Sequence, residues 1–290
     1  MKVGIIGAGS VGSTTAFALI MRGVARKVVL IDANEKKAQA EAMDIAHATP
    51  FAYANKVKAG TYEDLKGCEI VIVTAGANQK PGETRIDLLG RNVKIFESII
   101  PQIAQAAPDT TLIITSNPAD IMTEVALKLS GFPKERVIGS GTVLDTARFR
   151  TLLGYHLGVS PQSIHANVIG EHGDSEVLVW SAGDAGTVSL DKLAEEFGKP
   201  FTPEVKAQID DCVRNAAYKY VDHRGSIRLS TAKGPLSTAL PEHCAAFAAP
   251  FPTMNMRFST SRPTMMTSKA SKTFAFLCRR YWANVAFITS

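Results

Sequence analysis

The sequence predicts an α/β protein, with a doubly wound parallel sheet followed by a second, smaller α+β domain. Short apolar runs of the buried-strand type alternate with helical stretches over residues 1–141, which is typical of a parallel sheet with helices on both faces. A glycine-rich turn joins the first strand to the first helix, and the second strand ends on an acidic residue. The smaller domain is expected at residues 142–226.

The first two strands and the helices after them have clear local signals. Residues 3–6 are an apolar run that ends at a glycine, and residues 27–31 are rich in Val and Ile. A helical stretch at 13–21 follows the glycines, and a more polar one at 35–47 follows the second strand. Two successive strand-helix steps are therefore expected.

The later elements repeat this alternation. Strands are expected at 70–74, 111–115 and 137–139, separated by helices at 86–106 and 121–129. The smaller domain should then contain an amphipathic helix, a strand and a long helix, at 145–157, 164–169 and 203–220.

The turn after the first strand has the G-x-G-x-x-G spacing of Rossmann-type dinucleotide-binding domains. Gly7 allows a tight turn, Gly9 lets the backbone approach a pyrophosphate, and Gly12 permits close packing of the helix on the strand. Asp32, which lies 20 residues after Gly12, can bond the ribose hydroxyls of NAD and repel the extra phosphate of NADP. We expect NAD as the cofactor; the alternative is an ordinary turn with a surface Asp.

The net charge of +5 is concentrated at the C-terminus. Residues 1–226 contain 24 Lys and Arg against 26 Asp and Glu, whereas residues 227–290 contain 8 Lys and Arg against Glu242 alone. Residues 227–290, the C-terminal tail, also lack a sustained period of 2 or 3.6. A basic arm that binds nucleic acid is one interpretation of this tail.

No membrane span or targeting segment is expected. No run of about 18 apolar residues could cross a bilayer, and the first strand begins within two residues of Met1, which leaves no room for a signal peptide. We therefore expect a cytoplasmic protein. The four cysteines form no C-x-x-C pair, and no metal site is predicted.

Four motifs extend the interpretation beyond the glycine turn. They lie at residues 76–89, which begin G-A-N-Q-K-P-G-E-T-R, at 115–120 (T-S-N-P-A-D), at 139–150, and at 170–176 (G-E-H-G-D-S-E). In this order they resemble the NAD-dependent L-lactate dehydrogenases, and the resemblance runs from Met1 to about Gly225. It implies hydride transfer between NAD and pyruvate or lactate.

The resemblance implies a role for each catalytic side chain. His172 is the expected general acid/base, and Asp145 should accept a hydrogen bond from its other ring nitrogen. Arg148, one helical turn after Asp145, would bind the substrate carboxylate through its planar guanidinium. Arg85 lies on the loop expected to be mobile and should polarise the substrate carbonyl when that loop closes. The implied substrate-binding residues are Gln79, Arg85, Asn117, Asp120, Asp145 and Arg148. The implied cofactor-binding residues are Gly7, Gly9, Val11, Gly12, Asp32, Lys37, Tyr62, Gly76, Ala77, Ser98, Thr115, Asn117 and Ser140.

Gln79 favours lactate over malate chemistry. In the related malate dehydrogenases an arginine at the matching position pairs with the second carboxylate of oxaloacetate, and a neutral amide leaves that charge unpaired. Malate dehydrogenase is the near alternative, and an inactive NAD-binding scaffold is another. Arg150 and His165 match positions that bind fructose 1,6-bisphosphate in many bacterial lactate dehydrogenases, which would imply an allosteric homotetramer.

The resemblance ends near Ser226. Ile227 stands where the family has the threonine that closes the substrate pocket, and no family pattern follows it. Read in another frame, codons permitted for residues 273–287 include D-V-C-L-S-L-P-A-I-L-G-E-R-G-V, and those for 254–259 include D-E-H-A-V-L; both resemble family segments. We therefore interpret the tail as a shifted reading frame, so its basic charge does not indicate a nucleic-acid partner.

Overall fold

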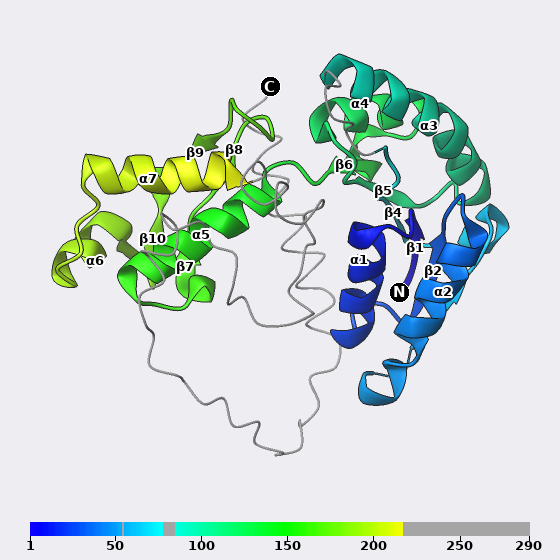
Figure 1. The fold of residues 1–290 in the computed structure, drawn as a ribbon, viewed down its shortest axis with the longest axis horizontal. Helices are drawn as coiled ribbons and strands as arrows, with labels where there is room; N and C mark the ends of the chain where they lie inside the picture. Colours follow the sequence, from blue (N-terminus) through cyan, green and yellow to red (C-terminus); the bar gives the residue numbers. More distant parts are fainter. Residues whose placement is uncertain (54, 78–84, 217–290) are drawn as a thin grey trace. The chain divides into compact units, whose positions relative to one another are not determined.

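The computed structural model of the chain (Figure 1) describes residues 1–53, 55–77 and 85–216. A six-stranded parallel sheet with strand order β3-β2-β1-β4-β5-β6 forms its N-terminal part. Its strands are β1 (Lys2–Ile6), β2 (Lys27–Ile31), β3 (Lys56–Ala59), β4 (Ile70–Val73), β5 (Thr111–Ile114) and β6 (Val137–Gly139). The predicted parallel sheet is confirmed.

The strand order reverses beside β1, so the chain extends the sheet first toward β3 and then, from β4, in the other direction. Ligands of such sheets bind at this point, outside the carboxyl ends of the strands. The turns after β1 and β4 meet there, because the Thr74 hydroxyl donates hydrogen bonds to the carbonyl oxygens of Ile6 at 3.2 Å and Gly7 at 3.0 Å.

The two faces of the sheet have separate hydrophobic cores because successive strand residues point to opposite sides. Val28 and Leu30 pack in the core with Ile20, whereas Val29 and Ile31 pack in the other core with Phe96. The helices of this part are α1 (Ser10–Met21), α2 (Glu35–Ala46), α3 (Arg85–Ala106) and α4 (Ala119–Ser130), with 3-10 turns at η1 (Thr49–Phe51), η2 (Tyr62–Leu65) and η3 (Lys134–Arg136). The first core contains residues of α1 and α2, and the second contains residues of α3 and α4. This is the doubly wound arrangement expected from the sequence.

The second part of the chain has α-helices around short antiparallel strands. Its helices are α5 (Val143–Leu157), α6 (Leu190–Glu196) and α7 (Pro203–Arg214), with 3-10 turns at η4 (Pro161–Ser163) and η5 (Trp180–Ala182). Its strands are β7 (Ile164–His165), β8 (Val168–Ile169), β9 (Val177–Leu178), β10 (Asp184–Ala185) and β11 (Val188–Ser189). Strands β11-β10-β7 form one sheet and β8-β9 another. Phe149 and Leu153 of α5 share a buried core with Ile209 and Val213 of α7.

The structure corrects three element boundaries. The single strand expected at 164–169 is two strands that pair in different sheets. The Arg150 guanidinium lies at the break, where it donates to the Ala166 carbonyl at 2.8 Å and the Asn167 side chain at 3.3 Å. Helix α1 begins at Ser10 and not at residue 13, so Gly12, the last glycine of the motif, lies inside its first turn. Helix α7 ends at Arg214, and residues 217–220 of the helix expected at 203–220 lie outside the described residues.

Within the described ranges, no helix combines the length and apolar character needed to cross a membrane.

Candidate active site

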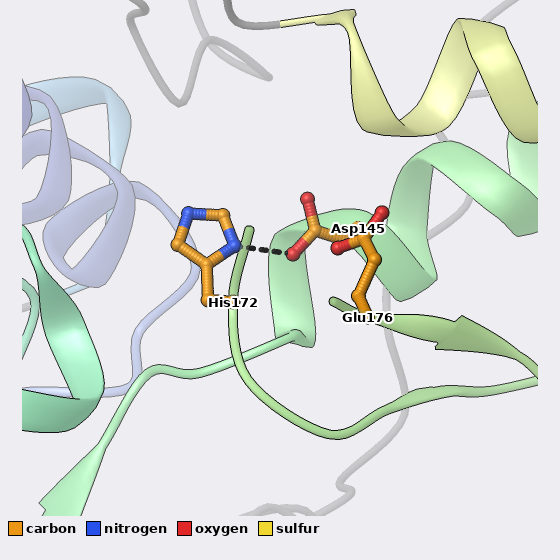
Figure 2. A group of neighbouring side chains, drawn as sticks. All are labelled: Asp145, His172 and Glu176. Atoms are coloured by element: carbon orange, nitrogen blue, oxygen red, sulfur yellow. Dashed lines mark hydrogen bonds and ion pairs between the residues drawn. The ribbon is translucent and has the colours of Figure 1, made fainter. Parts of the chain in front are cut away.

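Asp145 and His172 form a hydrogen-bonded pair, as the sequence predicts. Asp145 lies in the first turn of α5 and is 1% exposed. His172 lies in the turn between β8 and β9, and its Nδ1 is 2.5 Å from Asp145 Oδ2. Figure 2 shows the imidazole ring facing the carboxylate. Because Nδ1 is engaged, Nε2 is the ring nitrogen that can exchange a proton with a bound molecule.

Arg148 occupies the second oxygen of the same carboxylate. Its Nη1 is 2.8 Å from Asp145 Oδ1, and the two residues are one helical turn apart on α5. One buried carboxylate thus orients both a proton-exchanging imidazole and an anion-binding guanidinium. Such pairing also compensates the cost of burying the charge of Asp145.

The pair has shifted pKa values in opposite directions. Burial, the largest single influence on Asp145, raises its pKa, but the hydrogen bond and charge of His172, together with the charge of Arg148, outweigh burial and lower it overall. The hydrogen bond to Asp145 raises the pKa of His172, against the opposing effect of burial. The imidazolium is therefore favoured to a higher pH than for a free histidine.

Asp120 supports His172 from another element. Its carboxylate, in the first turn of α4, accepts a hydrogen bond at 2.9 Å from the His172 backbone N–H. Gly170 and Gly173, on either side, have φ values of 92° and 149°, which glycine adopts readily. The predicted substrate-binding residue Asp120 thus also fixes the backbone of the turn that presents His172.

Glu176 is a member of this cluster whose role the sequence did not predict. It is 2% exposed, and its carboxyl Oε1 has no hydrogen-bond partner within the described residues. One carboxyl oxygen of Asp145, one of Glu176 and one ring nitrogen of His172, all atom types that can bind a metal ion, lie within 4.8 Å of one another. The only sequence signal was its position in the motif at 170–176. Since Asp145 is already paired with His172 and with the cationic Arg148, we interpret the cluster as a proton-transfer site and not as a cation site.

The glycine turn has the close packing that its spacing predicts. Gly7 has a φ of 107°, and a Cβ at Gly12 would lie 1.8 Å from the Gly7 carbonyl oxygen. At Gly9, by contrast, a Cβ would meet nothing within 4 Å. The chain is thus tightly packed where α1 crosses β1, and has open space beside Gly9 at the start of the helix, where a phosphate binds in dinucleotide sites. These residues fit an NAD pyrophosphate.

Asp32 closes this turn from the end of β2. Its Oδ2 accepts a hydrogen bond from the Ala8 N–H at 2.6 Å, and its Oδ1 accepts one from the Asn34 N–H at 2.9 Å. The predicted ribose-binding carboxylate is therefore held beside the glycine turn by backbone groups.

Asn92 is a second residue that sequence reasoning missed. It is 2% exposed on α3; its side-chain oxygen accepts from the Ala77 N–H at 2.8 Å, and its amide nitrogen donates to the Asn117 carbonyl at 2.7 Å. Asn92 therefore ties the segment after β4 to the segment after β5, both of which contain predicted site residues. A buried Asn in a helix has no local sequence signal that separates it from a solvated one.

The other predicted site residues have varied positions. Five follow the carboxyl ends of parallel strands, namely Gly76, Ala77, Thr115, Asn117 and Ser140. Val11 and Lys37 lie in the first turns of α1 and α2, Tyr62 begins η2, and Ser98 on α3 donates to the Ile95 carbonyl. Arg85 begins α3, but its side chain and all of Gln79 lie outside the described residues. Arg150 bonds Ala166 and Asn167, as given above, and His165 is exposed on β7.

Comparison with known proteins gives consistent results for this chain. Residues 1–139 match the NAD-binding domain of the lactate/malate dehydrogenases, and residues 142–247 match the α/β C-terminal domain of the same group. The chain is 57% identical over 226 residues to the L-lactate dehydrogenase of Thermus aquaticus and 55% identical over 226 residues to that of Allorhizobium ampelinum. Each alignment covers 78% of this chain and 73% of the relative.

A solved structure supports the same assignment of the fold. The minor L-lactate dehydrogenase from Enterococcus mundtii, in a ligand-bound form, superposes with a TM-score of 0.74 at 40% sequence identity. The superposition covers 78% of this chain and 72% of that one.

Proposed function

This chain belongs to the lactate/malate dehydrogenase family, and from that premise we propose that it interconverts pyruvate and (S)-lactate, with His172 as the general acid and base. As a member of the family it is an NAD-dependent oxidoreductase, with its NAD-binding domain at residues 1–139. The observation that carries the proposal is the single buried carboxylate of Asp145, which contacts both His172 and Arg148.

The residues around Asp145 provide the proton and the substrate anchor. In pyruvate reduction, protonated His172 donates from Nε2 to the ketone oxygen while Asp145 stabilises the imidazolium through Nδ1. Arg148 binds the substrate carboxylate, and Asp145 fixes the plane of its guanidinium. Arg85 and Asn117 are the further polar groups proposed to contact the substrate oxygens.

The N-terminal domain positions the cofactor. The turn with Gly7, Gly9 and Gly12 would hold the pyrophosphate at the start of α1, and Asp32 would bond the adenosine ribose. When bound, NADH supplies the hydride for the substrate carbon. Asn92 keeps the Ala77 and Asn117 segments together at the strand ends where the nicotinamide half would lie.

Substrate choice is the finer part of the proposal. Gln79 provides a neutral amide where oxaloacetate would need a cation, so we expect pyruvate to be the preferred substrate. The test is NADH oxidation with pyruvate and with oxaloacetate, for the wild type and for Gln79→Arg. We expect the wild type to prefer pyruvate and the variant to gain oxaloacetate activity. A wild-type preference for oxaloacetate would favour malate chemistry, and NADH binding without turnover would favour the scaffold interpretation.

Regulation by fructose 1,6-bisphosphate at Arg150 and His165, in a homotetramer, is a second proposal. It is supported by position: the Arg150 guanidinium contacts the Ala166 carbonyl, next to His165, which is exposed. An Arg and a His suit phosphate oxygens. Activity and sedimentation should be measured with and without the sugar bisphosphate, for the wild type and Arg150→Gln. Equal activity of the wild type in both conditions would refute this regulation.

The C-terminal tail is proposed to be a frame-shifted form of the family C-terminus. The 226-residue alignments to the two relatives support a break near Ser226, although the family domain match extends to residue 247. Sequencing the gene across codons 220–230, with mass spectrometry of the purified chain, tests this. A continuous, unshifted reading frame would rule it out.

A further inference from the structure

Glu176 is a buried acid next to the Asp145–His172 pair, and it has no role in the reaction proposed above. The residue precedes β9 and is 2% exposed. One of its carboxyl oxygens, one of Asp145 and a ring nitrogen of His172 all lie within 4.8 Å of one another. Figure 2 shows the three side chains converging, with Asp145 between His172 and Glu176 in this view. The acid therefore lies close to the carboxylate that orients His172.

Two buried carboxyl groups this close favour a state in which only one of them is ionised, since like charges destabilise each other. Asp145 is the member that stays ionised, because His172 and Arg148 both contact it. The proton thus belongs to Glu176. Burial, followed by the charge of Asp145, raises the pKa of Glu176 to about 7.

The charges that face Glu176 come from three segments. Asp145, which is itself paired with Arg148, lies on α5, and His172 lies in the same turn as Glu176. Arg214 on α7 lowers the pKa of Glu176, as does His172. Arg214 is itself held by Asp210 at 2.8 Å and by the Asp174 carbonyl at 3.0 Å. These cations oppose burial but do not cancel it.

We propose that Glu176 is a positioning residue for the proposed reaction, which in its protonated form is a neutral neighbour of Asp145 and on ionising adds a negative charge close to His172. The inference rests on the proposed function only for its effect on turnover. The predicted effect of the Glu176 charge on the pKa of His172 can be measured without any reaction. Ionised Glu176 stabilises the imidazolium, and it weakens the attraction of Arg148 for a substrate carboxylate.

The size of the coupling follows from the separation. The Glu176 carboxyl oxygen and the His172 ring nitrogen lie within 4.8 Å of each other. At that distance, Coulomb's law with a dielectric constant between about 80 and about 20 gives a shift in the His172 pKa of roughly 0.6 to 2.5 units when Glu176 ionises. Replacing Glu176 with Gln keeps the size and polarity of the side chain but removes the negative charge. We therefore expect Glu176→Gln to lower the apparent pKa of His172 by at least about half a unit.

The experiment is an NMR pH titration of the histidine ring signals in the full chain, with His172→Gln used to assign the signal among the six histidines. The wild-type His172 signal should show two inflections, because it also reports the ionisation of Glu176. Glu176→Gln should leave one inflection at lower pH. Glu171→Gln is the matched control, since Glu171 lies in the same turn, is exposed, and accepts a hydrogen bond from Ser175 instead.

Kinetics then separate this inference from the proposed function. Pyruvate reduction by Glu176→Gln should fall at a lower pH than that of the wild type, because the missing negative charge lowers the pKa of His172, whereas Glu171→Gln should keep the wild-type pH profile. A shift of the His172 titration without pyruvate turnover would refute only the proposed function. A single wild-type inflection, or an unshifted His172 signal in Glu176→Gln, would overturn the role of Glu176 even in an active enzyme. The wild-type titration decides the matter if the variant fails to fold.

Discussion

Gly12 and Gly9 provide a matched test of the turn after β1. At Gly12 a Cβ would lie 1.8 Å from the Gly7 carbonyl oxygen and 2.8 Å from the Thr74 hydroxyl. A carbon–oxygen contact normally needs roughly 3.3 Å, so the first obstacle, which is backbone, would have to move by about 1.5 Å. Gly9 meets nothing within 4 Å, and its φ of −75° suits any residue.

The expected energies differ accordingly. Overpacking in a well-packed interior costs about 1–3 kcal/mol and occasionally more. Because the obstacle at Gly12 is backbone, we expect Gly12→Ala to lower the free energy of unfolding by about 3 kcal/mol or more. Gly9→Ala replaces a helix N-cap glycine in open space and should cost about 1 kcal/mol or less. Its methyl group would instead occupy the space through which a pyrophosphate approaches.

Urea unfolding and NADH titration by fluorescence measure the two effects separately. Gly12→Ala should lower the unfolding midpoint, whereas Gly9→Ala should keep a near wild-type midpoint but bind NADH at least about tenfold more weakly, a loss of about 1.4 kcal/mol. Wild-type stability of Gly12→Ala would refute the packing argument. Wild-type NADH affinity of Gly9→Ala would refute the assignment of the cofactor turn.

Three further predictions concern the active site. Arg148→Lys keeps the charge but loses the planar fork, so KM for pyruvate in steady-state assays should rise by about 10- to 100-fold; an unchanged KM would remove Arg148 from the substrate site. Asn92→Leu leaves the Ala77 N–H and the Asn117 carbonyl without this partner, and should lower the free energy of unfolding in urea by about 1–3 kcal/mol per unpaired group; a loss below about 0.5 kcal/mol would contradict this. The pKa of the Glu176 acid is raised in the folded state, from 4.5 to about 7, so the folded state binds the extra proton in that range and stability relative to Glu176→Gln should fall as the pH rises from 4.5 to 7, by a few kcal/mol at most. Parallel stability curves for the two proteins over this pH range would refute the shift.

Much of the parallel-sheet domain could be predicted from the sequence. Its strands are buried on both faces, so they are continuous apolar runs that stand out from the polar turns around them. The short antiparallel strands of the second part were missed, or merged at 164–169, because two-residue strands have no measurable period. Strand β3 has the sequence K-V-K-A and lies at the edge of its sheet, with too little apolar content to be recognised.

The sequence by itself determined the chemistry available in this protein: a glycine turn for a dinucleotide, an acidic residue at the end of β2, and a His, an Asp and an Arg in motifs that resemble one enzyme family. These signals are local, since each depends on spacing within one turn or helix. Only the tertiary structure placed Asp120 on the His172 backbone across 52 residues of sequence, Asn92 between two strand ends, and Glu176 against Asp145. The physical reason is that backbone propensity and periodicity act over a few residues, whereas the burial and charge that tune a pKa depend on which elements pack together.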